Sequence, residues 1–319
     1  MIIRRDRGFA ARRILLVAVV VAGWSVAGCS LLTDNQVSAV NQFSEATKGF
    51  GTTPGTVITA YAGLRSERAL LESATRSDGN AAAKDLASGL QQRIGLESRA
   101  ASSDAAVRVL DDYAQMLSLL SSSKFTDDLQ NQTVALGSSI DNGVATFNRL
   151  SGSQVNSFGD IVAGIVRGAG GLWIRREQHK ALVAAVTQAK APINELTTHI
   201  EQLMTFFVGT PASDDPEANL FARESKEVQG FLARSQPAGR SVEVLERTQT
   251  AMRAAVDGQN LATSCRKAAA QYRSAHSELV QAVTNEKTDM KGLIAQIQTL
   301  SQEIKAAKRV QGEVRKARE

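Results

Sequence analysis

The sequence predicts an all-α protein, arranged as an elongated antiparallel helical bundle or coiled-coil-like rod with a long C-terminal helix. Apolar residues recur at helical spacing over long windows, whereas the alternation typical of strands is scarce. Prolines number five in 319 residues, so the chain has few points at which a helix must break. From Ala262 to Val314, mostly apolar residues recur at alternating steps of three and four residues, as in a coiled coil. We call this row of positions the C-terminal seam.

The same spacing places the individual helices in chain order. Val37, Val40 and Phe43 mark a first amphipathic helix, with Asp34 as the expected N-cap. We expect each later helix to stop at a serine-, glycine- or proline-rich turn. Pro192 should kink the fifth helix. The later helices are expected at about 57–76, 81–120, 129–150, 158–207 and 216–235, followed by the C-terminal helix.

The C-terminal seam predicts one unbroken helix from Ala262 to Val314. At 1.5 Å per residue such a helix reaches roughly 80 Å. Its apolar positions need cover from earlier helices or from a second copy. Cys265 and His276 lie on the seam, so we expect a small buried thiol and a hydrogen-bonded core or interface histidine.

The first thirty residues have the layout of an export signal. Five arginines precede an apolar run from Ile14 to Val21, which is too short to span a membrane, and small residues follow. At 26–29 the chain reads Val-Ala-Gly-Cys, which resembles the lipobox of bacterial lipoproteins. The resemblance covers only this segment, and no family is recognised for the helical body.

The lipobox resemblance implies that Cys29 carries a diacylglyceryl group and an acyl chain, and that residues 1–28 are removed. Residues 29–35 then form a lipidated tether, and 36–319 form a single all-α domain. Ser30 in place of aspartate implies the outer membrane, with the body in the periplasm. Three alternatives stay open: cleavage after Ser25-Val26-Ala27, an uncleaved anchor, or twin-arginine export through Arg12-Arg13.

The charge balance argues against a nucleic-acid partner. The sequence pI is about 9.3, but the signal holds five of the 37 basic residues and one of the 32 acidic residues. Its removal leaves one excess positive charge, so the high pI reflects targeting. We expect a membrane contact through the lipid, and a protein partner or self-association through helices, with no further cofactor and no small-molecule substrate.

Motifs that mark enzymes are missing from the sequence. There is no G-x-S-x-G, H-E-x-x-H, C-x-x-C or phosphate-binding glycine loop, and His179, His199 and His276 lack ligand spacing. The expected function is therefore that of a non-enzymatic structural, spacer or partner-binding protein of the cell envelope. An enzyme is a distant third, behind a membrane-inserting protein.

The membrane-inserting alternative depends on the glycine-rich segment 158–176. Five glycines in one helical segment need a reason, because glycine costs about 1 kcal/mol relative to alanine. We expect close helix packing, with a partner groove as a further option. Membrane insertion would instead resemble, in layout only, the apolar hairpin of helical pore-forming toxins. The residues concerned are Gly164, Gly168 and Gly171 on one stripe, followed by Trp173, Arg175 and Arg176.

Overall fold

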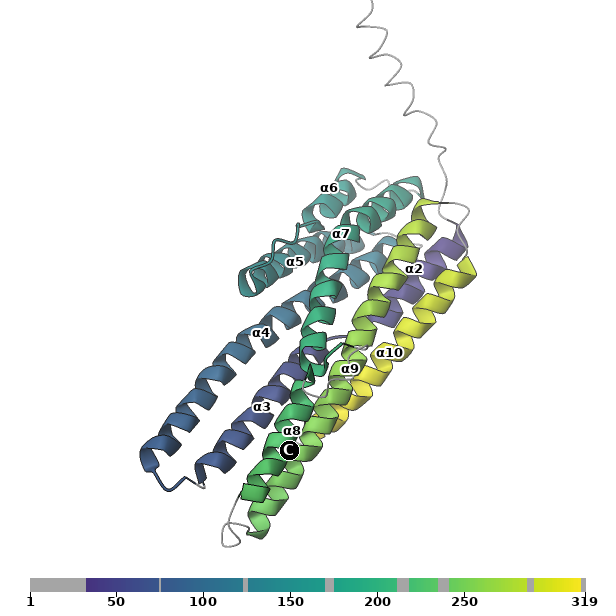
Figure 1. Ribbon diagram of the computed structural model, residues 1–319. Coiled ribbons are helices and arrows are strands. Elements are labelled where there is room, and N and C mark those ends of the chain that lie inside the picture. The colour runs from purple at the N-terminus through teal and green to yellow at the C-terminus, as the bar shows by residue number, and fades with distance from the viewer. Residues whose placement is uncertain are drawn as a thin grey trace, which may run out of the picture.

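The computed structural model describes residues 33–74, 76–122, 126–169, 175–210, 218–234, 241–285 and 290–316. Every regular element in these ranges is an α-helix, which confirms the all-α prediction. The helices form an elongated bundle (Figure 1). They are α2 (Asp34–Thr47), α3 (Thr53–Ala74), α4 (Gly79–Leu120), α5 (Asp127–Ser151), α6 (Gly159–Ala169), α7 (Arg175–Val208), α8 (Leu220–Arg234), α9 (Val242–Thr284) and α10 (Met290–Lys316).

Helix α2 begins one residue earlier than the sequence suggested. Thr33, rather than Asp34, is the N-cap: its side chain accepts from the Gln36 N–H, and the Gln36 side chain accepts from the Thr33 N–H. Because this capping box fixes the first turn, the tether expected over 29–35 ends at Thr33. At the other end of α2, Gly49 has φ of +96°, a conformation that favours glycine, and the chain turns there toward α3.

Helices α3 and α4 form an antiparallel hairpin whose turn precedes Asp78, the N-cap of α4. Helix α4 has 42 residues and passes Ser102 and Ser103 without a break. Both serine hydroxyls donate to the Arg99 carbonyl, so they are satisfied within the helix. Helix α5 then returns along the C-terminal half of α4 (Figure 1).

The single helix expected over 158–207 is wrong, because two helices, α6 and α7, occupy this stretch. Helix α6 packs mainly against α5, whereas α7 packs along α9. The apolar face of each helix thus has a different neighbour, which one continuous helix could not reach. Pro192 does lie inside α7, as expected.

The unbroken C-terminal helix is also wrong: α9 ends at Thr284, and α10 returns beside it. The predicted seam is nevertheless buried on both helices, for example at Tyr272 and Leu279 on α9 and at Leu300 on α10. Heptad position 286 is a glutamate, inside the polar run Asn-Glu-Lys-Thr-Asp of 285–289. Five polar residues in a row provide no apolar face with which a continuous helix could pack. The apolar faces of α9 and α10 instead cover each other.

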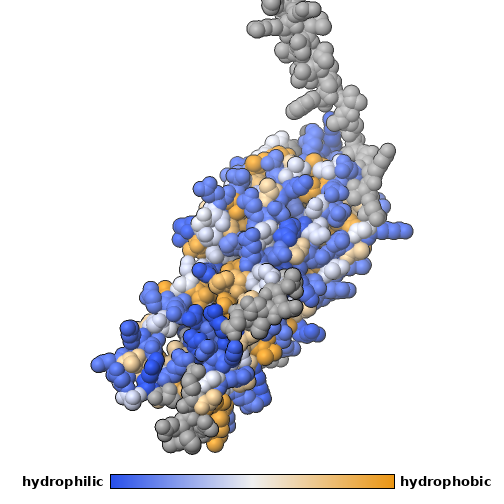
Figure 2. All heavy atoms as spheres, viewed as in Figure 1, coloured by the Kyte–Doolittle hydropathy of each residue, from blue (hydrophilic) through white to orange (hydrophobic). Residues whose placement is uncertain are grey.

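Aromatic side chains fill the core between the helices. Phe43 on α2 meets Tyr272 on α9 edge to face, with ring centroids 5.3 Å apart. Tyr61 on α3 packs in the same manner against Phe207 and Phe221, at 5.2 Å and 5.4 Å. The face of the molecule seen in Figure 2 is mostly hydrophilic, with scattered apolar patches. A core of this kind ties α2, α3, α7, α8 and α9 into one body.

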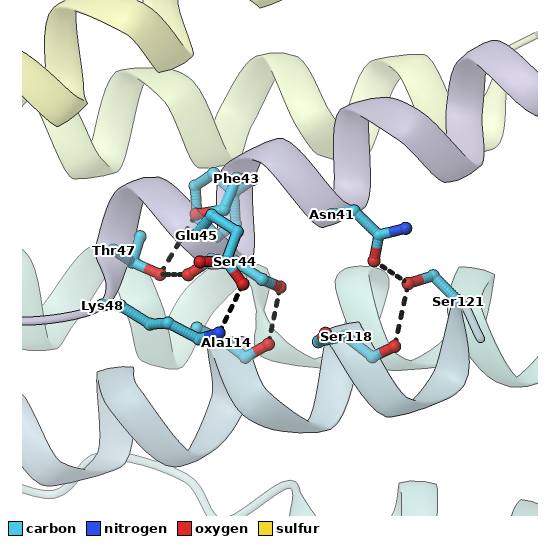
Figure 3. A network of polar contacts seen from close by, with 9 residues as sticks. All are labelled: Asn41, Phe43, Ser44, Glu45, Thr47, Lys48, Ala114, Ser118 and Ser121. Atoms are coloured by element: carbon cyan, nitrogen blue, oxygen red, sulfur yellow. Dashed lines mark hydrogen bonds and ion pairs between the residues drawn. The ribbon is translucent and has the colours of Figure 1, made fainter.

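Polar contacts add to the packing of α2 against α4 (Figure 3). The Ser44 hydroxyl donates to the Ala114 carbonyl at 2.6 Å, and the Ser121 hydroxyl donates to Asn41 Oδ1 at 2.5 Å. Because residue numbers rise on one helix as they fall on the other, these pairs show that α2 and α4 run antiparallel.

Candidate functional site

Different helix ends lie at the two ends of the bundle. We call the end where α2 begins the Thr33 end. The start of α2 lies there beside the end of α9, because Gln36 Nε2 donates to the Ala282 carbonyl at 2.8 Å. The start of α7 lies near the end of α4, since Gln178 Nε2 donates to the Leu120 and Ser122 carbonyls. The opposite, far end holds the α3–α4 turn (Figure 1).

Cys29, the predicted lipid attachment site, lies outside the described residues. It precedes the capped residue Thr33 by four positions in the sequence. A fully extended chain spans at most about 3.6 Å per residue, so four residues reach no more than ~14 Å. A lipid on Cys29 would therefore hold the Thr33 end of the bundle close to the membrane surface.

The glycine stripe does not pack as expected. Gly164 and Gly168 are exposed, and a Cβ added at either one meets no atom within 4 Å. Close packing at these two glycines is thus wrong. Gly171 and Trp173 lie outside the described residues; Arg175 is the first residue of α7, and Arg176 is exposed.

The close approach of helices occurs at another glycine of the same stretch. A Cβ on Gly159 would lie 2.0 Å from the Gly137 carbonyl oxygen, so α5 and α6 touch through their backbones. Asp141 on α5 accepts from the Gly159 and Asp160 N–H groups at 2.7 Å and 2.8 Å. This carboxylate caps α6. A sequence signal existed, since Gly137 and Gly159 are both glycines within helical patterns.

The seam histidine and cysteine are core residues, as predicted. His276 Nε2 lies 2.8 Å from the Tyr113 hydroxyl, and burial lowers the pKa of this imidazole to about 3. Cys265 is fully buried, and burial raises the pKa of its thiol well above the usual value. A neutral imidazole and a protonated thiol stabilise packing and offer no reactive group to solvent.

Sequence reasoning missed a buried ion cluster between α3 and α8. Glu224 on α8 has a side chain only 1% exposed, and it pairs with Arg68 at 2.8 Å and Arg65 at 3.5 Å. The Tyr61 hydroxyl donates to the same carboxylate at 3.2 Å, and burial followed by the charge of Glu224 raises the tyrosine pKa. Breaking one partner would leave a buried charge, so the cluster fixes where α8 docks.

Two further acids lie on α4, on the side that meets α3 and α10. Burial raises the pKa of Asp104 to about 6, against the opposing effect of the Gly55 N–H and of Arg108. Burial and the neighbouring Asp112 raise the pKa of Asp111 to about 6, which Lys308 opposes. Both acids are half-buried, and nothing in the local sequence marks them as such, because the groups near them come from helices distant along the chain.

An apolar row remains uncovered near the far end. Leu86, Leu90 and Ile94 on the first half of α4 are 41%, 61% and 53% exposed. Their spacing is helical, so they share one face of α4. The sequence shows the row, but only the structure shows that no described helix covers it.

The described residues contain further surface features without a marked chemical character. A groove of about 830 Å³ runs between α2 and α10, with Val37 and Ile297 beside Asp34, Glu45 and Lys305. No cluster of three or more possible metal ligands occurs among the residues that the structure places. Nor does any described helix have the length and apolar character needed to cross a membrane.

Comparison of the chain with protein families, curated proteins and solved structures finds no match in any of the three.

Proposed function

We propose that this protein is a lipid-anchored, non-enzymatic component of the bacterial cell envelope that acts as a spacer or binds a protein partner. The observation that carries the proposal is the lipobox cysteine, Cys29, placed four residues before a capped helix of a packed bundle. Two or more acyl chains give stable membrane attachment, which a single chain does not. The proposed address is the outer membrane, with the body in the periplasm.

The shape of the bundle supports a spacer. Helix α4, with 42 residues, is about 63 Å long. The Asn41–Ser121 contact sets α2 so that Thr33 lies eight residues, or ~12 Å, beyond the end of α4. An anchor at the Thr33 end would thus hold the far end roughly 75 Å away if the bundle stands upright.

A cysteine substitution tests the anchor. We expect Cys29→Ser to move the mature protein into the soluble fraction, or to leave the signal uncut, and to abolish incorporation of labelled fatty acid. Cys265→Ala is the matched control, because Cys265 is buried in the core and should carry no lipid. If the Cys29→Ser protein is processed and remains membrane-bound like the control, the anchor is not at Cys29.

Membrane insertion through the 158–176 segment is the second candidate. Ile161 is 47% exposed on α6, on the same side of the chain as the open glycines Gly164 and Gly168. Leucine at Gly164 would add apolar area worth ~25 cal/mol per Å² in a lipid contact, without a clash in the bundle. Dye release from liposomes by purified protein, raised by Gly164→Leu, would favour this candidate. Intact liposomes with both proteins would exclude it.

A further inference from the structure

The uncovered row on α4 belongs to a longer seam. Ala83, Ala87, Leu90 and Ile94 follow one another at steps of four, three and four residues, and all four are exposed. This is the spacing of a helix that packs against another helix. We name these four residues the α4 seam; Leu86 lies beside them on the same helix face.

The α4 seam continues an interface that already exists in the bundle. Ala105 lies eleven residues after Ile94, which is about three turns, so both share one face. At the level of Ala105, α5 covers this face of α4. The Ala105 carbonyl and Val109 lie against Gly143, and the Ser139 hydroxyl donates to Asp112 at 2.6 Å. Since α5 is antiparallel to α4 and ends at Ser151, it leaves the seam below it bare.

We infer that the α4 seam binds the α4 seam of a second copy of this chain, with the two helices antiparallel. In that arrangement Ala83 faces Ile94 of the second copy and Ala87 faces Leu90, so each large side chain meets a small one. The contact is isologous, since each copy offers the same surface to the other.

The position of α5 selects the antiparallel arrangement. In a parallel pair the upper half of the second α4 would run where α5 already lies. In the antiparallel pair the two α5 helices lie at opposite ends of the shared seam and do not meet. Among the charged residues near the seam, Arg93 and Glu97 already pair within α4 at 2.9 Å, so neither approaches the second copy without a partner.

The size of the seam sets the strength of the pairing. Three large apolar side chains and two alanines form a patch of the size that ordinary monomers expose, about 300–600 Å². A permanent dimer needs about 800 Å² from each partner. We therefore expect weak pairing that becomes populated only at high protein concentration.

The pairing has a consequence that rests on the proposed lipid anchor. The level of the seam centre lies ~60 Å from the Thr33 end of each copy, by the rise of α4 and α2. An antiparallel pair thus places two anchors roughly 120 Å apart, at opposite ends of the assembly. Two copies that stand upright in the same membrane therefore cannot form this pair.

Disulfide trapping tests the pairing with the full mature chain. Cys265 is buried and unreactive, so a cysteine introduced at the seam is the accessible thiol once Cys29 is lipidated or replaced by serine. Ala87→Cys and Leu90→Cys proteins carrying different tags are mixed at high concentration and oxidised. We expect the mixed disulfide at least ~10-fold above the Leu90→Cys homodimer, because only facing seam positions come within disulfide reach. Ser88→Cys, which is exposed on another face of α4, is the control.

Three results would overturn the inference. Equal trapping of Leu90→Cys with itself would indicate a parallel or random contact, and trapping no greater than that of Ser88→Cys would mean that no seam pairing exists. A fluorophore on Leu90→Cys that responds to vesicles but not to added protein would assign the seam to lipid. Because the Cys29→Ser protein serves equally well in the trapping, the pairing and the anchor fail or succeed separately.

Discussion

The two halves of α4 have the same helical pattern and opposite surroundings. Leu110, Tyr113 and Leu117 in the second half are buried, whereas Leu90 and Ile94 in the first half are exposed. Both sets recur at steps of three, four or seven residues. The comparison teaches that spacing identifies the apolar face of a helix but does not reveal whether this chain supplies the cover.

The largest contrast should come from matched leucines on the two halves. Leu110→Ala removes a side chain that is 1% exposed, and we expect the free energy of unfolding to fall by about 2–5 kcal/mol. Leu90→Ala should change it by less than ~0.5 kcal/mol, as at other exposed sites. Urea denaturation measures both. Similar losses for the two variants would show that the first half is packed as well.

The packing of α5 against the second half of α4 can be weakened at the contact between α5 and α6. Gly159→Ala puts a methyl group into the Gly137 carbonyl, and we expect a loss of about 1–3 kcal/mol in unfolding free energy. Gly164→Ala meets no neighbour and replaces a helical glycine, so it should stabilise the protein by up to ~1 kcal/mol. Thermal denaturation of the two variants decides the point; a stabilising Gly159→Ala would contradict the backbone contact.

The second half of α4 also contains a buried polar contact, between Tyr113 and His276. Tyr113→Phe leaves the Nε2 atom of His276 without its 2.8 Å partner, and we expect a cost of about 1–3 kcal/mol. Tyr272→Phe removes a longer contact of 3.2 Å to the Leu110 carbonyl and should cost about 0.5–1.5 kcal/mol. Denaturant titration measures the loss of unfolding free energy in each variant, and Tyr113→Phe should lose more. A larger loss for Tyr272→Phe would indicate that His276 has another partner.

Two half-buried acids in the second half of α4, Asp104 and Asp111, predict a smaller effect, a dependence of stability on pH. Asp104 and Asp111 have pKa values near 6 in the folded protein and near 3.8 otherwise, so the folded state binds more protons between these values. Their contribution to stability is complete below pH ~4 and is lost as pH rises through about 6. The Asp104→Asn/Asp111→Asn protein should lack this component. His276 acts in the opposite sense, because its pKa is lowered to about 3, and stability falls as pH drops below about 6.5.

Comparison of wild type with the double variant isolates the two acids, since His276 contributes equally to both proteins. The difference between their unfolding free energies should change from pH 4 to pH 7, with the wild type losing stability relative to the variant. A difference that stays constant over this range would show that the two carboxyls titrate normally.

Much of the fold was predictable because helical periodicity is local. The helix class, the buried Cys265 and the core histidine His276 followed from spacing alone. The turn after Thr284 was missed because the heptad positions continue in register across it, although Glu286 breaks their apolar character. The glycine contact was placed at Gly164 instead of Gly159, because helical spacing gives a stripe and not the neighbour that meets it. Glu224, Asp104 and Asp111 gained their surroundings from distant helices, which no local pattern encodes.

Hydrogen exchange along α4 tests the central contrast most directly. In dilute mature protein, we expect amides of 100–120 to exchange only with global unfolding, and amides of about 82–98 to exchange much faster through local opening. When the protein is concentrated in solution, protection should rise in 82–98 alone. Uniform slow exchange along the whole of α4, independent of concentration, would contradict the account.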